Sequence, residues 1–357
     1  GKRRERCKRW LLPVKAPCQD HLTSRHAMIP MAEVTIQQLK EEIQVLKRET
    51  STIVLAHYYQ ITDVQDIGDF LGDSLGLSRK AASVTTAKNI VFAAVDFMAE
   101  VAKIIAPSKH VYMPDRTASC PMANQLRATD VLMQKKRFPG LPVVLYINTL
   151  AEAKAECDVV CTSSNAIEVC SKVAKEHRVD SIIMGPDKNL SYHVEKRANI
   201  KVITVPDKGC CYVHDQFTIE DVNLQRQRFP VAKLVVHPEC KPEIQEAADF
   251  VGSTTQMLQY IENGMARCKE FIIGTEQGLL DHLSRKHPDL KLHSLAPVPQ
   301  GIACKNMKKT TLQKVRDVLL AIKAGTAADR EVLVDERVAA RAKNAIDAMF
   351  KYSTGSG

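Results

Sequence analysis

The sequence predicts an α/β fold in which one αβα unit with a parallel sheet occurs three times, related by a pseudo-threefold axis around a central site. Three observations indicate this. Three cysteines, Cys120, Cys211 and Cys304, recur at intervals of 91 and 93 residues, each shortly after a strand-like run and a proline. Other short segments repeat in the same register. Strand-like and helix-like segments alternate throughout, which is typical of parallel sheets covered by helices on both faces.

Two sets of short segments share the spacing of the cysteines. The first starts with aspartate, continues through two apolar residues and ends on a hydroxyl-bearing residue, at residues 69–74, 158–163 and 249–254. The second is an apolar run that ends on an acidic residue, at residues 90–96, 182–187 and 272–276. Because several features rarely keep one period by chance, we interpret the chain as three copies of one unit.

The expected elements follow the same order in each copy. A β-branched strand (residues 52–57, 143–147 or 233–237) precedes a helix (63–70, 151–156 or 242–249). A short strand, a helix, a third strand, another helix and the strand leading to the cysteine come next. We place the repeats at residues 35–138, 139–229 and 230–308, the first including an N-terminal helix over 35–50. Two helices of a C-terminal segment 309–357, over 310–324 and 330–350, are expected to cap the assembly through their apolar stripes.

Composition limits the class of protein. The hydrophobic fraction of 45% and the charged fraction of 25% are ordinary for a soluble globular protein. The net charge is +9, but residues 1–26 hold eight of the basic and only two of the acidic residues, so the rest gives no case for a nucleic-acid surface. Residues 1–34 are expected to form a basic, disordered extension; a targeting arm, an RNA-contacting arm and an upstream translation artefact are the alternatives.

Cysteine usage points to the compartment and to the chemistry. Eleven cysteines, an odd number without a secretory signal, indicate the reducing cytoplasm and thiols used as ligands. No apolar run is long enough to span a bilayer. Three thiolates at one point suit an iron–sulfur cluster, zinc or copper(I). A 4Fe–4S cluster on three cysteines keeps one iron open to act as a Lewis acid. Core cysteines without a ligand, zinc held by the three cysteines and His214, and Cys210 in place of Cys211 remain alternatives.

Polar residues recur where the predicted strands end and helices begin. The hydroxyls of Ser74, Ser163 and Thr254 precede or start helices; they are either ordinary N-caps or part of a site for an anionic substrate. The first strands end in His57-Tyr58-Tyr59, Tyr146-Ile147-Asn148 and His237-Pro238-Glu239. Glu239 and Tyr59 are the best candidates for proton transfer, followed by His57 and His237. Gly72-Asp-Ser-Leu-Gly76 matches the GxSxG pattern of a hydrolase, a weak alternative.

The chain resembles the quinolinate synthase family from about Ile53 to Val315. The matching segments are Ala56-His-Tyr-Tyr59, Gly72-Asp-Ser-Leu75, Phe97-Met-Ala-Glu100, Tyr146-Ile-Asn-Thr149, Thr162-Ser-Ser-Asn-Ala166, Pro186-Asp-Lys-Asn-Leu190, Val213-His-Asp215, His237-Pro-Glu-Cys240, Val251-Gly-Ser-Thr254, Gly274-Thr-Glu276 and Asn306-Met-Lys308. The resemblance implies three αβα domains and a 4Fe–4S cluster with one open iron. It also implies condensation of iminoaspartate with dihydroxyacetone phosphate to quinolinate, with loss of phosphate and water, in NAD biosynthesis.

The same resemblance implies roles for particular residues. Cys120, Cys211 and Cys304 would hold the cluster. Glu239, Tyr59 and His57 would be catalytic. Substrate would be bound by His57, Ser74, Tyr146, Ile147, Asn148, Ser163, His237, Pro238, Glu239 and Thr254. An L-aspartate oxidase could deliver the unstable imine by transient contact, whereas no nucleic acid or membrane partner is implied.

The chain departs from the family sequence at two places, and two other functions are alternatives to the one that the resemblance implies. Ala94-Val95-Asp96 stands where the family has Gly-Val-His, and Ser119-Cys-Pro-Met122 where it has Gly-Cys-Ser-Met. Neither removes an expected ligand, but Asp96 would alter the charge near the site if it lies there. The alternative functions are another 4Fe–4S hydro-lyase and a non-catalytic iron–sulfur sensor. The polar strand ends in all three copies disfavour the sensor.

Overall fold

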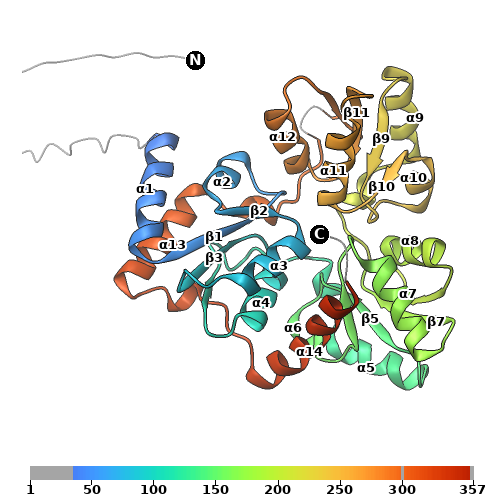
Figure 1. The fold of residues 1–357 in the computed structure, drawn as a ribbon, viewed down its shortest axis with the longest axis horizontal. Coiled ribbons are helices and arrows are strands. Elements are labelled where there is room, and N and C mark those ends of the chain that lie inside the picture. The colour runs from blue at the N-terminus through green and yellow to red at the C-terminus, as the bar shows by residue number, and fades with distance from the viewer. Residues whose placement is uncertain (1–34, 299–300, 354–357) are drawn as a thin grey trace, which may run out of the picture. The chain divides into compact units, whose positions relative to one another are not determined.

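A computed structural model describes residues 35–298 and 301–353. The expected basic extension 1–34 and the last four residues of the expected tail lie outside the described residues. Strands of the described part form three separate parallel sheets of four strands each, with helices between the strands (Figure 1). This confirms the predicted α/β class. Within the same part of the chain, no helix is long and apolar enough to cross a membrane.

The three sheets have the same strand order, in which the second strand lies at one edge and the fourth at the other. Sheet A contains β1 (Thr52–His57), β2 (Phe70–Gly72), β3 (Asn89–Ala93) and β4 (His110–Tyr112). Sheet B contains β5 (Val143–Tyr146), β6 (Val159–Cys161), β7 (Ser181–Gly185) and β8 (Lys201–Thr204). Sheet C contains β9 (Lys233–Val236), β10 (Phe250–Val251), β11 (Glu270–Gly274) and β12 (Lys291–Ser294). The common order agrees with one unit used three times; the exact domain boundaries stay a prediction.

The helices also follow one order in each copy. After the first, second and third strands come α2 (Thr62–Ile67), α3 (Ser74–Ser83) and α4 (Asp96–Ile105) in the first copy. Their counterparts are α6 (Ala151–Lys154), α7 (Ala166–His177) and α8 (Lys188–Ala198), then α10 (Pro242–Ala247), α11 (Thr254–Gly264) and α12 (Gln277–Lys286). Each proposed ligand cysteine follows the fourth strand, three residues before a short 3₁₀ turn: η1 (Ala123–Gln125), η2 (His214–Gln216) or η3 (Met307–Lys309).

The helix that follows each cysteine packs on the next sheet. Helix α5 (Ala128–Arg137) inserts Val131 between residues of sheet B, and α9 (Ile219–Arg228) inserts Val222 among residues of sheet C. Helix α13 (Leu312–Ala324) returns to sheet A, where Leu319 packs against Val54 and Val91, beside α1 (Ile36–Glu49) (Figure 1). Helix α13, which follows the third cysteine, therefore completes the core on sheet A.

The last helix begins later than the sequence suggested. We expected it to start at residue 330, but α14 spans Glu336–Tyr352. Glu331 instead forms an antiparallel bridge with Tyr112, and the amide of Val332 donates to the carbonyl of Val111 at 2.7 Å. This short segment covers the exposed edge of sheet A at β4, and Asp335 then caps the helix. Edge pairing therefore overrides the helical periodicity of these residues.

A repeated aspartate ties the second strand of each sheet to the first. Asp69, Asp158 and Asp249 each accept a hydrogen bond from the backbone amide 15 residues upstream, at 2.7, 2.7 and 2.8 Å. Each also pairs with a lysine at 2.8, 3.0 and 2.8 Å. This contact explains why aspartate opens the first set of repeated segments.

Replacing Asp158 by alanine is expected to lower the free energy of unfolding by about 1–3 kcal/mol, because the amide of buried Val143 loses its partner. Urea denaturation measures this. Asp329→Ala, at an exposed site whose ion pair with Arg330 spans 4.0 Å, should change the value by less than about 0.5 kcal/mol. Equal effects of the two substitutions would contradict this role of Asp158.

Candidate active site

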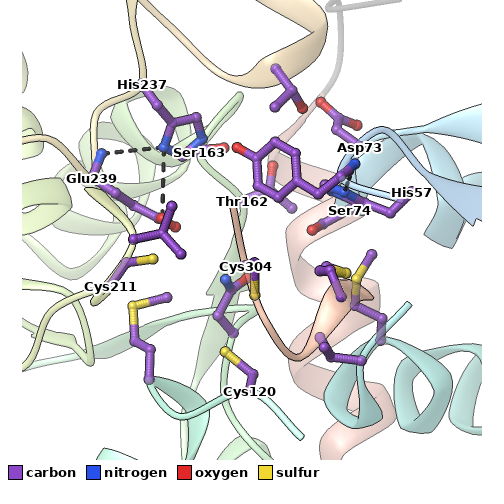
Figure 2. Close-up of a pocket in the computed structure, with 18 of the residues that line it drawn as sticks. His57, Asp73, Ser74, Cys120, Thr162, Ser163, Cys211, His237, Glu239 and Cys304 are labelled. Atoms are coloured by element: carbon purple, nitrogen blue, oxygen red, sulfur yellow. Dashed lines mark hydrogen bonds and ion pairs between the residues drawn. The ribbon is translucent and has the colours of Figure 1, made fainter. Parts of the chain in front are cut away.

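One pocket is lined by residues that lie at or after strand ends in all three repeats (Figure 2). Twelve of the fourteen residues predicted for the site line it: His57, Tyr59, Ser74, Cys120, Tyr146, Asn148, Ser163, Cys211, His237, Glu239, Thr254 and Cys304. Parallel strands place their carboxyl ends and the loops that follow at one edge, so equivalent loops from the three sheets can meet here.

Two predicted residues do not line the pocket. Ile147 lies between Tyr146 and Asn148 at the end of a strand, so its side chain points the opposite way and is buried in the core. Pro238 is also buried, and its carbonyl accepts a hydrogen bond from the side chain of Gln245 at 2.8 Å. The structure therefore gives neither side chain a direct position in the pocket.

The starts of three helices contribute hydroxyl groups to the pocket. Ser74 and Thr254 are the first residues of α3 and α11, and the capping hydrogen bond is made by the preceding Asp73 or Ser253. The cap role is thus taken by neighbours, and Ser74 and Thr254 line the pocket instead. Ser163, before α7, hydrogen-bonds to the phenol of Tyr146. The amides and the positive dipole ends of these helices favour anionic groups.

The hydrolase alternative is not supported by the geometry around Ser74. A nucleophile elbow requires a strained turn that exposes the serine. Ser74 instead begins a regular helix, and it is not among the described non-glycine residues with positive φ, which are Ser51, Arg178 and Asn199. The GxSxG match therefore reflects a helix start that also has counterparts in the other two copies.

Two neutral histidines occupy equivalent positions at the ends of β1 and β9. His57 Nδ1 accepts the amide of Tyr59 at 3.0 Å, and His237 Nδ1 accepts the amide of Glu239 at 3.3 Å. Burial lowers the pKa of both imidazoles to about 3. Since Nδ1 is the acceptor in a neutral ring, Nε2 carries the hydrogen. Both residues can therefore donate one hydrogen bond to a ligand.

A chain of buried hydrogen bonds connects residues of different sheets. Tyr59 and Thr275 hydroxyls are 2.8 Å apart, and Thr275 Oγ1 is 2.9 Å from His214 Nε2. His214 Nδ1 is 2.8 Å from Glu239 Oε2, and Tyr146 donates to Glu239 Oε1 at 2.7 Å. A carboxylate cannot donate, so Nδ1 of His214 carries the hydrogen and Nε2 accepts from Thr275, whose oxygen accepts from Tyr59.

The surroundings of Tyr59 keep its phenol protonated, whereas those of Glu239 keep its carboxyl ionised. Burial raises the pKa of the Tyr59 phenol well above its usual value, and the nearby Glu239 charge raises it further. Burial would also raise the pKa of Glu239, but the hydrogen bonds from His214 and Tyr146 hold it below its usual range. The ionised carboxylate of Glu239 can stabilise a protonated His214, as in catalytic triads of hydrolases. Tyr59 is thus connected to His214 through the hydroxyl of Thr275, and Glu239 lies beside His214.

Sequence analysis missed Thr275 and considered His214 only as a zinc ligand. Thr275 lies in the third copy of the apolar run that ends on an acidic residue, and His214 lies three residues after Cys211. Both are buried, with 2% and 1% of their surface exposed. Because Thr275 is 216 residues from Tyr59, no local pattern connects them.

One polar atom of a residue that lines the pocket has no hydrogen-bond partner among the described residues. The amide oxygen of Asn148 is buried and accepts no hydrogen bond within the described part of the chain. Leaving a buried polar atom unpaired costs about 1–3 kcal/mol, which a ligand carrying an N–H or O–H donor at this point would recover. The oxygen of Asn148 therefore offers a hydrogen-bond acceptor at the pocket.

The side chains of the three cysteines lie near one another on one side of the pocket (Figure 2). Burial raises the pKa of the Cys120 thiol to about 12 and that of Cys211 well above its usual range. Thiols held in this way become thiolates when a positively charged metal group binds them, so the donor set fits such a group. Cys211 lines the pocket, whereas the neighbouring Cys210 does not.

The metal-ligand group found among the described residues contains only two members of the expected zinc set of three cysteines and His214. The sulfur of Cys211, an imidazole nitrogen of His214 and a carboxylate oxygen of Glu239 lie within 4.8 Å of one another. Both ring nitrogens of His214 are, however, already engaged, with Glu239 and with Thr275. Zinc bound to His214 would have to break one of these contacts.

The stability of the protein should fall as the pH is lowered from about 6.5 toward about 3, partly because of His57. Above its ordinary pKa of 6.5 this residue is neutral in both folded and unfolded chains. Below it, the unfolded chain binds a proton that the folded chain does not bind, so folding is progressively disfavoured. In urea denaturation, His57→Gln should reduce the pH slope by up to about 1.4 kcal/mol per pH unit. An unchanged slope would show that His57 is protonated in the folded protein.

Comparison with known proteins adds a family match to this geometry. The family model described as quinolinate synthetase A protein matches residues 41–351. The quinolinate synthase of Thermococcus onnurineus is 45% identical over 318 residues, which are 89% of this chain and 99% of that protein. That of Pyrococcus furiosus is 44% identical over the same shares of both chains. That of Thermotoga maritima is 43% identical over 87% of this chain and 98% of that protein.

Proposed function

The chain belongs to the quinolinate synthetase A family, and from this premise we propose that it is an enzyme that forms quinolinate for NAD biosynthesis. The proposed reaction condenses iminoaspartate with dihydroxyacetone phosphate and releases phosphate and water. The observation that carries the proposal is the pocket where three cysteines from three sheets meet the hydrogen-bond chain from Tyr59 to Glu239. A dehydrating condensation needs groups that move protons, and a metal group can assist it as a Lewis acid.

The proposed cofactor is a 4Fe–4S cluster held by Cys120, Cys211 and Cys304. When bound, such a cluster supplies an open iron that acts as a Lewis acid toward a hydroxyl or carboxylate of the substrate. The phenol of Tyr212 donates to the sulfur of Cys304 at 3.6 Å, and His214 Nδ1, whose hydrogen is shared with Glu239, lies 3.3 Å from the sulfur of Cys211. Contacts of this kind tune the electronic properties of a thiolate-bound metal.

The remaining pocket residues are proposed to bind the anionic substrates and move protons. Ser74, Ser163 and Thr254 at the helix starts would bind carboxylate or phosphate oxygens. His57 and His237 would each donate from Nε2, and Asn148 Oδ1 would accept from the substrate. Tyr59 would remove or return the proton of a reacting group, and its own proton would pass through Thr275 to His214, with Glu239 stabilising the resulting charge.

The setting of the enzyme is also a proposal. The many free thiols among the described residues suit a reducing cytoplasm. Iminoaspartate is unstable in water, so transient contact with an L-aspartate oxidase would shorten its path to the pocket. No feature of the described surface requires a nucleic acid.

Anaerobic purification, with absorbance and iron and sulfide counts, followed by an assay for quinolinate, tests the function. The expected result is a brown protein that forms quinolinate from dihydroxyacetone phosphate and enzymatically generated iminoaspartate. A colourless zinc protein would overturn the cluster assignment. A loaded cluster without quinolinate formation would favour another hydro-lyase or, if no substrate is turned over, a sensor.

Single alanine substitutions of Cys120, Cys211 or Cys304 are each expected to abolish cluster binding, because each removes one of three ligands. Cys157→Ala and Cys268→Ala are the matched controls, because these thiols bond to backbone carbonyls at 3.3 and 3.2 Å and do not line the pocket. Iron and sulfide counts measure the outcome. Full cluster content in Cys211→Ala would transfer the ligand role to Cys210.

Thr275→Val should lower kcat by about 10²- to 10⁴-fold, because the proton of Tyr59 loses its path to His214. Thr275→Ser, which retains the hydroxyl, is the matched control and should keep most of the activity. Tyr59→Phe should be as severe as Thr275→Val. Steady-state kinetics with equal cluster content checks this, and a Thr275→Val enzyme as active as Thr275→Ser would exclude the relay.

A further inference from the structure

Each of the three ligand cysteines is bonded through its backbone to an acidic side chain of its own repeat. The amide of Cys120 donates to Asp96 Oδ1 at 3.1 Å, and that of Cys211 to Asp187 Oδ2 at 3.1 Å. The amide of Cys304 donates to Glu276 Oε1 at 2.9 Å. These acidic residues are the ends of the second set of repeated segments, at the junction of the third strand and the following helix. We call Asp96, Asp187 and Glu276 the carboxylate clamp.

Each clamp residue is itself fixed to the start of a helix. Asp96 Oδ1 accepts the amide of Phe97 at 2.8 Å, and Asp187 Oδ1 accepts that of Leu190 at 2.7 Å. Glu276 Oε2 accepts the amide of Gly278 at 2.6 Å. One carboxylate therefore joins the cysteine backbone to a rigid strand–helix junction. None of the three lines the pocket, so substrate contact does not explain them.

Burying these carboxylates lowers the stability of the folded protein. Asp187 and Glu276 are buried, with 1% and 0% of their surface exposed, close to thiols that become negative on binding a metal. Lys308 lies 2.9 Å from Glu276, and fully buried Lys154 lies near Asp96 and Glu100. Asp187 has no ion pair with a basic side chain in the described ranges. In each of the three repeats a carboxylate accepts a hydrogen bond from the backbone amide of the cysteine. This repetition indicates that the carboxylates position the cysteines.

We propose that Asp96, Asp187 and Glu276 are positioning residues that hold the backbones of Cys120, Cys211 and Cys304 in place for the metal group. This inference rests on the proposed iron–sulfur function. It assigns a role to Asp96, which differs from the residue expected from the family resemblance. It also explains why the acidic residue is repeated although no repeat uses it in the pocket.

The three clamp residues differ in which carboxylate oxygens accept the two hydrogen bonds. Asp187 and Glu276 use one oxygen for the cysteine amide and the other for the helix amide. An amide side chain in their place would turn its NH₂ toward a backbone N–H in either orientation. Asp96 uses the same oxygen, Oδ1, for both amides. Asparagine can keep that oxygen, so Asp96→Asn should be tolerated and Asp96→Ala should not.

The test compares full-length protein purified anaerobically with its cluster. Release of iron to a chelator should be about tenfold to a hundredfold faster in Asp187→Asn and Glu276→Gln than in the unchanged protein. Asp96→Asn should release iron within about twofold of the unchanged rate, and Asp96→Ala should resemble Asp187→Asn. Asp158→Ala is the control for general destabilisation, because it breaks a similar carboxylate–amide bond in a segment without a ligand cysteine.

Hydrogen exchange provides a readout that does not depend on the cluster. Mass spectrometry of the peptides containing Cys211 and Cys304 should show faster exchange of these amides in Asp187→Asn and Glu276→Gln, respectively, and not in Asp158→Ala. Unchanged iron release and exchange in both amide variants would overturn the clamp. Asp96→Asn as damaging as Asp96→Ala would overturn the one-oxygen account. If Asp187→Asn does not fold, the Asp96 pair and Glu276→Gln decide the question.

The two proposals fail in different ways. If the unchanged protein holds no iron and sulfide, the proposed function fails, whereas the exchange measurement still decides whether the carboxylates hold the cysteine backbones. If the cluster is present and the variants behave as the unchanged protein does, the clamp fails and the proposed function stands.

Discussion

The fold depends on one packing constraint: each sheet completes its cover with the helix that follows the cysteine loop of the preceding repeat. The chain leaves β4, passes through Cys120 and continues into α5, which packs on sheet B. The next two cysteine loops likewise run from one sheet to the next, and α13 brings the chain back to sheet A. A cysteine loop is therefore fixed at both ends by different cores. This places each thiol between sheets, where the three loops can meet.

The same arrangement explains why the pocket holds so many buried polar groups. The carboxyl ends of parallel strands leave backbone and side-chain groups that need partners. Here the partners come from other repeats, as when Tyr146 of sheet B bonds to Glu239 after sheet C. Burial makes His57 and His237 neutral donors, while hydrogen bonds keep Glu239 ionised. The site thus contains defined hydrogen-bond donors, one ionised carboxylate and a chain of hydrogen bonds that joins this carboxylate to Tyr59.

Much of the fold and of the candidate site could be predicted because the three copies repeat short sequence patterns. The register of Cys120, Cys211 and Cys304 and the repeated aspartates indicated three units, and the first strands of sheets B and C end within one residue of their predicted ends. The start of α14 was not predictable, since Glu331 pairs with an edge strand more than 200 residues earlier. Ile147 and Pro238 were named with their neighbours, but strand alternation and backbone geometry turn them away from the pocket.

By itself, the sequence determined the α/β class, the threefold period and the residue types available at the ends of strands, because these depend on short-range patterns. Only the tertiary structure decided which of those residues meet. It joined Tyr59 to Thr275 and His214, chose Cys211 over Cys210 for the pocket, and set Asp96, Asp187 and Glu276 against the cysteine amides. The physical reason is that hydrogen bonds depend on distances of about 3 Å in space, which the packing of three sheets sets and spacing along the chain does not.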